Sequence, residues 1–391
     1  ARSSIATEEL FDALRDPSFD VRYEAILALG HLPLSQSVTK ALENILFHHA
    51  LGSLAAKTRR IEKLSAKIAQ AVGAPAAACV RAASLCKADL VTGMVGEFPD
   101  LQGIMGRYLA RHDGEPAAVA RAIEEHYLPR YAGGALPQSP AGQVLALADR
   151  LDSLVGLFIA GEEPTGEKDP YGLRRAALGV IRILVEKKLD LNVAALVEDA
   201  ADGYASDGLV SGESAKSQCA TFILERYRAL YTTLGFAQDE ISAVLEAGAS
   251  RPLDFDRRLK AVSRFRHHRD APSLAAANKR IRNILRKSEE SIPAQIDAQQ
   301  LTESAEIALS QAILKTAGAI APAIAKGDYA AALRTLAGLR PVVDGFFDEV
   351  MVMSPDRAVR TNRLALLGQL NQLFLGIADI SLLQTLETGD G

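Results

Sequence analysis

Apolar residues at helical spacing constrain this chain most, and the clearest run lies between residues 144 and 158. Seven of them fall on one stripe of a helix: Val144, Leu147, Ala148, Leu151, Leu154, Val155 and Phe158. Such a stripe predicts a helix with a buried face. Aromatic residues make up only 5% of the chain and tryptophan is absent, whereas strands depend on aromatic and β-branched side chains. We therefore expect an all-α protein.

The length of 391 residues predicts two or three domains. The three cysteines, Cys79, Cys86 and Cys219, have no C-x-x-C spacing, so they indicate neither a disulfide framework nor a zinc site. No apolar run approaches the ~20 residues that span a bilayer, and the first residues lack the apolar core of a signal peptide. We expect a cytoplasmic protein that does not enter a membrane.

Residues 5–46 resemble a single HEAT-type repeat. Two helical patterns flank the break at Asp16-Pro17-Ser18. One such repeat cannot bury its own apolar face and must pack on the next helices of the chain or on a partner. The pattern fits the first two helices of a larger bundle equally well.

The middle of the chain predicts further helices. We expect them at residues 46–71 and 76–95, a proline-broken stretch at 96–140 with a short helix at about 117–127, and a helix from Asp169-Pro170 to about Lys188. Less distinctive helical patterns continue to residue 248.

A basic window from Arg251 to Glu290 stands out against the formal net charge of −4, because it holds twelve Lys and Arg against five Asp and Glu. On a helix at residues 277–287, one face would carry the cations Lys279, Arg282 and Arg286. Ile281, Ile284 and Leu285 would face the core. Such clusters bind phosphates, although a solvated surface helix carries the same pattern.

Five segments, taken in order, resemble the β subunit of the bacterial-type tetrameric glycyl-tRNA synthetase, in its C-terminal portion. They cover much of the chain between about residues 48 and 383. The segments are Cys86 to Glu115, Ala122 to Pro137, Ala146 to Leu184, Phe255 to Lys287 and Phe346 to Leu383. Gly134, Glu167 and the pair Tyr171-Gly172 depart from the family pattern, and the family's N-terminal half has no counterpart here.

The resemblance implies three parts: a HEAT-like helical hairpin at 1–46, a degenerate HD-like helical domain at 47–250, and a C-terminal anticodon-binding (DALR-like) helical bundle at 251–391. It implies a tRNA-binding subunit of glycine-tRNA ligase that positions glycine tRNA for aminoacylation by a separate α subunit. ATP and Mg²⁺ would be used by that α subunit, with no cofactor on this chain. The assembly would be a hetero-oligomer.

An HD hydrolase uses histidine and aspartate ligands to bind metals that activate water. The corresponding positions here are His48 or His49, then Ala88-Asp89, then Asp149. Because Ala88 stands where a histidine ligand is required, we expect a relict centre without metal, in which Asp89 and Asp149 cap helices or pair with Lys and Arg. Asp149 and Asp152 could also be an acid pair. The alternatives are an active HD-family metal-dependent phosphohydrolase and a HEAT-like scaffold with an inactive synthetase remnant.

With the resemblance, the basic window becomes a predicted tRNA-binding site. The residues assigned to tRNA are Arg264, Arg266, Arg269, Lys279, Arg282 and Arg286, with Lys168, Arg174 and Arg175 in a second loop. That loop, with Arg107, Arg111 and Arg130, could contact the acceptor arm or form salt bridges. Phe265, Phe346 or Phe347 could stack on anticodon bases, though the last two fit a core equally well. His112, His126, His267 and His268 are expected on the surface.

Overall fold

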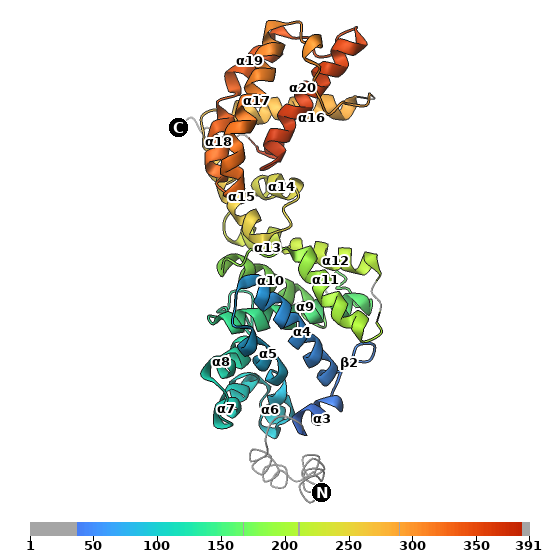
Figure 1. Cartoon of the computed structure of the whole chain (residues 1–391), viewed down its shortest axis with the longest axis vertical. Helices are drawn as coiled ribbons and strands as arrows, with labels where there is room; N and C mark the ends of the chain where they lie inside the picture. The colour runs from blue at the N-terminus through green and yellow to red at the C-terminus, as the bar shows by residue number, and fades with distance from the viewer. Residues whose placement is uncertain (1–36, 167, 210–211, 289, 385–391) are drawn as a thin grey trace, which may run out of the picture. The chain divides into compact units, whose positions relative to one another are not determined.

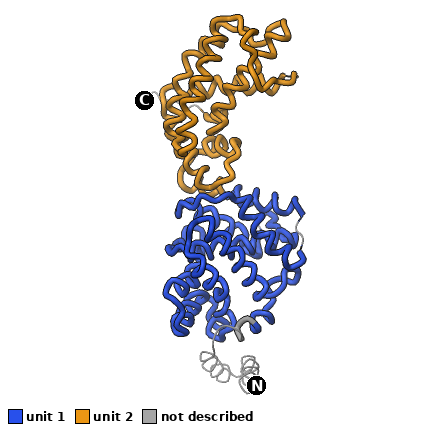
Figure 2. The backbone as a smooth tube through the Cα atoms, in the orientation of Figure 1, with its two compact units in different colours: residues 1–226 blue, residues 227–391 orange. Residues whose placement is uncertain are grey.

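The computed structural model describes residues 37–166, 168–209, 212–288 and 290–384, and it divides the chain into two compact units, 1–226 and 227–391 (Figure 2). Both units are built of helices, and within those ranges the strands are confined to one short antiparallel pair. The all-α prediction is confirmed. The predicted HEAT-like hairpin falls almost entirely on residues 1–36, which lie outside the described ranges.

The first unit follows the chain through α-helices, two short strands and two 3₁₀ helices (Figure 1). Its elements are α3 (Ser37–Glu43), β1 (Leu46–His48), β2 (Gly52–Ser53), α4 (Leu54–Val72), α5 (Ala76–Leu85), η1 (Ala88–Val91), α6 (Gly93–Glu97), η2 (Pro99–Leu101), α7 (Ile104–His112), α8 (Ala117–Glu125), α9 (Pro140–Ile159), α10 (Leu173–Glu186), α11 (Val193–Ser206) and α12 (Glu213–Leu224).

Helix α9 is the centre of the first unit, where α4, α5, α8, α10, α11 and α12 all pack against it. The predicted apolar stripe is buried along its whole length, and Leu145, Ala146 and Leu157 outside the stripe are buried too. A helix that is apolar on nearly all sides belongs in the middle of a bundle. Ser139 caps its first turn by accepting a hydrogen bond from the Gly142 N–H.

The prediction of a helix from residue 46 is wrong over its first turns. Residues 46–53 form the antiparallel pair β1–β2, and α4 begins only at Leu54. Gly52, the first residue of β2, has a φ of +86°, at which a side chain would be strained. Ser53 then caps α4 through the Ala56 N–H.

The single helix predicted at residues 76–95 is also wrong, because α5 ends at Leu85 and is followed by η1 and α6. The proline-broken stretch hides α7, which the sequence did not predict. Gly103 precedes α7 at a φ of +78°, and its N–H donates to the carboxylate of Asp89. A buried acid distant in the chain therefore replaces the local capping residue that helix prediction looks for.

Helix α10 starts at Leu173, not at Pro170 as predicted. Asp169 still caps it, because its two carboxylate oxygens accept the N–H groups of Leu173 and Arg174 at 2.7 and 3.0 Å. Gly172 takes a left-handed conformation that turns the chain into the helix.

The second unit is a helical bundle. Its elements are α13 (Arg226–Thr233, from its second residue onward), α14 (Gln238–Glu246), α15 (Pro252–Arg266), α16 (Ala271–Lys287), η3 (Ala298–Gln300), α17 (Ser304–Ala325), α18 (Tyr329–Ala337), α19 (Arg340–Glu349), α20 (Arg357–Leu375) and η4 (Ile380–Leu382). Helix α17 packs on α18, α19 and α20, and α16 packs on α20 and η4. The predicted helix at 277–287 is part of α16 and begins six residues earlier.

The first unit ends at Arg226 and the second begins at Tyr227, whereas the predicted domain boundary at 250/251 falls inside the second unit. The aromatic packing explains the assignment of α13. Tyr227 stacks on Phe255 of α15 with ring centroids 3.9 Å apart, and Tyr231 contacts the same ring. These buried contacts tie α13 to the second bundle.

Helix α17 is the one helix, within the described ranges, that is long and apolar enough to cross a membrane by length and composition. This differs from the expectation that no apolar segment approaches that length. Its Glu306 is fully buried and pairs with Arg363 of α20. An internal ion pair and packing on three helices are also typical of a folded bundle.

Candidate functional site

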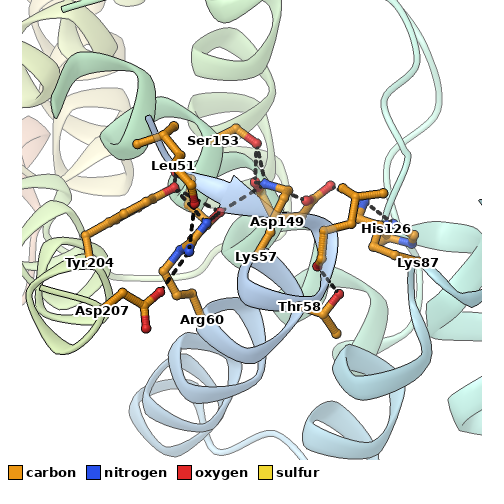
Figure 3. A network of polar contacts seen from close by, with 12 residues as sticks. Leu51, Lys57, Thr58, Arg60, Lys87, His126, Asp149, Ser153, Tyr204 and Asp207 are labelled. Atoms are coloured by element: carbon orange, nitrogen blue, oxygen red, sulfur yellow. Dashed lines mark hydrogen bonds and ion pairs between the residues drawn. The ribbon is translucent and has the colours of Figure 1, made fainter. Parts of the chain in front are cut away.

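The first unit contains a buried network of charged side chains around α9 (Figure 3). Asp149 lies between two lysines: the Lys87 ammonium is 2.9 Å from its Oδ2 and the Lys57 ammonium is 3.2 Å from its Oδ1. Both lysine side chains are almost completely buried. Burial opposes ionisation of Asp149, but Lys87 and Lys57 outweigh that effect and hold its pKa well below the ordinary value.

His126 completes the Lys87 side of the network. Its Nε2 lies 3.0 Å from the Lys87 ammonium, which can only donate, so Nε2 accepts and Nδ1 donates to the Ile123 carbonyl. Burial, with the neighbouring positive charge of Lys87, holds the pKa of His126 well below its usual range. The expectation that His126 is a surface residue is wrong, because its side chain is fully buried and neutral.

The Lys57 side continues through Asp152 to Arg60. Lys57 lies 3.1 Å from Asp152 Oδ2, and Arg60 Nε donates to Asp152 Oδ1 at 2.8 Å. The Arg60 guanidinium also lies over the Tyr204 ring and pairs with Asp207. Asp149 and Asp152 are thus each neutralised by buried cations. They are poorly arranged to exchange protons with a substrate, as an acid pair would require.

The residues at the relict HD positions do not fit a metal. Within the described ranges, no group of three or more His, Cys, Asp or Glu side chains is placed to hold one. Two lysine ammonium groups pair with the carboxylate of Asp149. In a metal-dependent hydrolase this carboxylate would have to be available to bind a metal cation. In the described part of the chain, these positions therefore do not form a metal site.

The three relict positions have separate roles. Asp89 is fully buried, and its Oδ2 accepts the N–H groups of Gly103 and Gly106 at the start of α7. Burial raises the pKa of Asp89 despite these hydrogen bonds. His48, on β1, lies 3.6 Å from Glu162 and packs edge-on against Tyr171. Of the three, Asp89 and Asp149 are within electrostatic reach of Lys87.

The predicted acceptor-arm cations of the first unit divide into a group bonded within the protein and a group exposed to solvent. Arg107 pairs with Glu124, and Arg130 donates to the Gln102 carbonyl at 2.5 Å. Arg174 donates to the Gly166 carbonyl. Lys168, Arg175 and Arg111 are exposed.

In the second unit, two of the six predicted tRNA-binding residues are engaged inside the protein. Arg282 pairs with Glu246 at 2.7 Å and with the buried Asp379. Arg266 is largely buried and lies 3.0 Å from Asp239 and 3.5 Å from Glu240. Their charges hold α14 and the C-terminal segment to α15 and α16.

The other four cations face solvent. Arg264, Lys279 and Arg286 are exposed and, within the described ranges, form no ion pair with a carboxylate, while Arg269 is 90% exposed beside Asp270. Lys279 and Arg286 lie seven residues apart on α16, about two helical turns, and so share a face. Ile281 beneath them is fully buried, as predicted, whereas Ile284 and Leu285 are half-buried.

The predicted stacking aromatics are mostly interior. Phe265 and Phe346 are buried, and Phe347 is half-buried with the Arg280 guanidinium 4.2 Å from its ring centroid. Neither buried ring can meet a base without unfolding part of the bundle.

Comparison with known proteins identifies the family to which the chain belongs. The family described as glycyl-tRNA synthetase beta subunit matches residues 32–246, more than half of the chain, and the DALR anticodon binding domain matches residues 274–386. The chain belongs to the glycyl-tRNA synthetase beta subunit family. The resemblance drawn from five segments is confirmed.

Individual relatives agree with this membership of the beta subunit family. The glycine–tRNA ligase beta subunit of Aeromonas hydrophila subsp. hydrophila is 49% identical over 343 residues, 88% of this chain and 50% of that protein. The protein of the same name from Pseudomonas aeruginosa is 48% identical over 348 residues, 89% of this chain and 51% of its own length. The chain therefore spans about half the length of the curated relatives it matches.

Sequence reasoning missed the two buried lysines, Lys57 and Lys87, that pair with Asp149. Lys57 continues the buried face of α4 with Ile61, Leu64 and Ile68, at spacings of four, three and four. His126 extends the buried face of α8 in the same way. A charged or imidazole side chain on an apolar stripe was the available signal, since such a group needs a buried partner.

Proposed function

We propose that this chain is the tRNA-binding part of a glycine-tRNA ligase, which holds glycine tRNA by its acceptor arm and anticodon for aminoacylation by a separate α subunit. It would work in the cytoplasm as part of a hetero-oligomer, with ATP and Mg²⁺ used by the α subunit. The observation that carries the proposal is the exposed cationic face of α16, since Lys279 and Arg286 lie within the segment that matches an anticodon-binding domain.

The physical basis is phosphate neutralisation. Exposed cations without internal partners displace the counterions condensed on an RNA backbone, which makes the affinity strongly dependent on salt. Holding the tRNA at two places would orient its acceptor end toward a catalytic site on another chain. The exposed Lys168, Arg175 and Arg111 are the candidates for contacts in the first unit.

We assign the 47–250 part a supporting role and not a hydrolytic one. The pairing of Asp149 with Lys87 and Lys57 argues against the metal-dependent phosphohydrolase alternative, because the site is already charge-neutralised by the protein. The match to an anticodon-binding domain, together with the beta subunit family match, favours tRNA binding over the other alternative, a HEAT-like scaffold with an inactive synthetase remnant. The division into parts at 1–46, 47–250 and 251–391 remains our functional proposal.

The test is filter binding of glycine tRNA over a range of salt concentrations. The variant Lys279→Ala with Arg286→Ala should bind about tenfold more weakly at moderate salt. The salt slope, which is the slope of log affinity against log salt concentration, should become shallower by about one to two. A matched control is Lys326→Ala with Arg334→Ala, which removes two exposed cations from α17's end and α18 in the same unit. Equal affinity and equal slope in all three proteins would contradict the proposal.

A further inference from the structure

The segment between α19 and α20 displays two methionines to solvent. Met351 is 70% exposed and Met353 is 56% exposed, whereas the alternating Val350 and Val352 are buried at 5% and 6%. The exposure of the side chains therefore alternates along residues 350–353, and the backbone bends at Val352 and Met353. The valines anchor this segment, which we call the methionine loop (residues 350–356), and the methionines face outward.

Helix α20 fixes the backbone of the methionine loop. The buried Arg363 pairs with Glu306 of α17 and donates to the Met351 carbonyl at 2.8 Å. Arg360 donates to the Ser354 carbonyl at 2.6 Å. Backbone groups on both sides of Met353 are thus tied to one helix. Two large apolar side chains held outward on a fixed backbone are preorganised for contact with a ligand.

The loop adjoins the cationic end of α16. Glu290, three residues beyond the last residue of that helix, accepts hydrogen bonds from Arg360 at 2.7 Å and from Thr361 at 2.9 Å. Arg357, at the start of α20, is 83% exposed and lies 3.7 Å from the same carboxylate. This bridge brings Arg286 and Lys287, at the end of α16, to the region where α20 begins and the methionine loop ends.

The second unit offers few other surfaces to a flat apolar ligand. Among its described residues, from 227 onward, the exposed large apolar side chains are Leu234, Ile307, Leu314, Met351 and Met353, and none is aromatic. Ile307 follows the buried Glu306 that holds Arg363, so it belongs to the same neighbourhood. Phe265 and Phe346 are buried and cannot present a ring to a ligand.

We propose that Met351 and Met353 form the surface on which unpaired bases of an RNA loop lie, while Arg286, Lys287 and Arg357 take the adjacent phosphates. This inference rests on the proposed tRNA-binding function and deepens it. A thioether is polarisable and makes favourable contacts with aromatic rings, and every base offers an aromatic face. The neighbouring cations favour an RNA loop over a protein partner as the occupant.

Oxidation footprinting tests the proposal on the unmodified protein. The chain has four methionines, at positions 94, 105, 351 and 353. The anticodon stem–loop of glycine tRNA is added at about ten times its dissociation constant. Dilute peroxide should then oxidise Met351 and Met353 at about one fifth of the rate in the free protein, or more slowly still. Met94 in the first unit, 37% exposed, is the internal reference and should be unaffected. Unchanged rates at both loop methionines would overturn the proposal.

A variant pair separates this inference from the proposed function. Met351→Gln with Met353→Gln keeps side-chain size and charge but removes the apolar surface. It should bind the stem–loop about tenfold more weakly, with the salt slope unchanged and binding to a fully paired RNA duplex unchanged. Leu314→Gln, at 67% exposure on α17, is the matched control.

The outcomes of these experiments distinguish failure of the methionine proposal from failure of the proposed tRNA-binding function. If the wild type binds the stem–loop in a salt-dependent way and the methionine variant binds equally well, the methionine proposal fails and the tRNA-binding function stands. If the wild type binds neither RNA, both fail. If the variant keeps its RNA affinity but no longer co-purifies with a glycyl α subunit, the loop is a protein-docking surface and the proposal is wrong.

Discussion

The cations of the buried network around α9 in the first unit and those along α16 in the second are the same residue types put to opposite uses. Lys57, Lys87 and Arg60 are buried against carboxylates of α9, while Lys279 and Arg286 extend into solvent. The first arrangement stabilises a fold and leaves no charge for a ligand. The second adds little to stability and remains available to phosphates. Whether a basic side chain serves structure or binding therefore depends on the acids that surround it.

The sharpest way to break this comparison is to remove Asp149. Asp149→Asn leaves the buried Lys87 without its carboxylate partner and removes one of the two that Lys57 has, so the free energy of unfolding should fall by about 3–5 kcal/mol. Urea denaturation measures the loss. The control Asp199→Asn breaks an exposed pair with Lys67 and should cost less than about 1 kcal/mol. Similar losses in the two variants would show that burial does not set the value of these pairs.

Helix α16 allows the comparison to be made within one element. Arg282→Ala leaves the carboxylate of Asp379, 2% exposed, without its cation, and should destabilise the protein by about 2 kcal/mol. Arg286→Ala, one turn further along, should leave the stability unchanged. Urea denaturation of the two variants side by side is the measurement. If Arg282→Ala weakens tRNA binding without lowering stability, its internal pairing is not the dominant role.

The pH dependence of stability should reveal the buried histidine. Because the pKa of His126 is lower in the folded protein, the unfolded chain takes up the proton first as the pH falls below about 6.5. Between about pH 6.5 and the pKa of His126 in the folded protein, the free energy of unfolding should therefore fall by up to about 1.4 kcal/mol for each pH unit of acidification. His126→Gln, which can still accept from Lys87, should flatten the slope measured by urea denaturation at pH 5–7. The exposed His112→Gln should keep the wild-type slope, and an unchanged slope in both would contradict the buried neutral imidazole.

The smallest effect on stability is expected for the proposed tRNA-binding face of α16. Lys279→Ala with Arg286→Ala should change the free energy of unfolding by less than about 0.5 kcal/mol, since neither side chain pairs with a carboxylate among the residues that the structure describes. Thermal unfolding measures it on the same samples used for filter binding. A large loss of stability would mean that weaker tRNA binding reflects damage to the fold, and the comparison between the two regions would no longer hold.

Several features were predictable because they depend on local spacing or linear order. The period of the apolar residues predicted α9, and the order of five segments predicted the family. The density of Lys and Arg between residues 251 and 290 indicated the basic region. Helix starts were less predictable, since α7 is capped by Asp89 from another part of the chain and α4 follows a strand pair.

The role of each charged residue could not be read from the linear pattern. Arg282 and Arg286 look equivalent along α16, yet Arg282 meets Glu246 and Asp379 while Arg286 meets solvent. Lys57 finds Asp152, 95 residues further along the chain, only because α4 packs on α9. Composition and periodicity therefore establish that the chain forms helices and carries a basic segment. Electrostatic pairing depends on distance and burial in three dimensions, so folding alone settles which of those cations remain free.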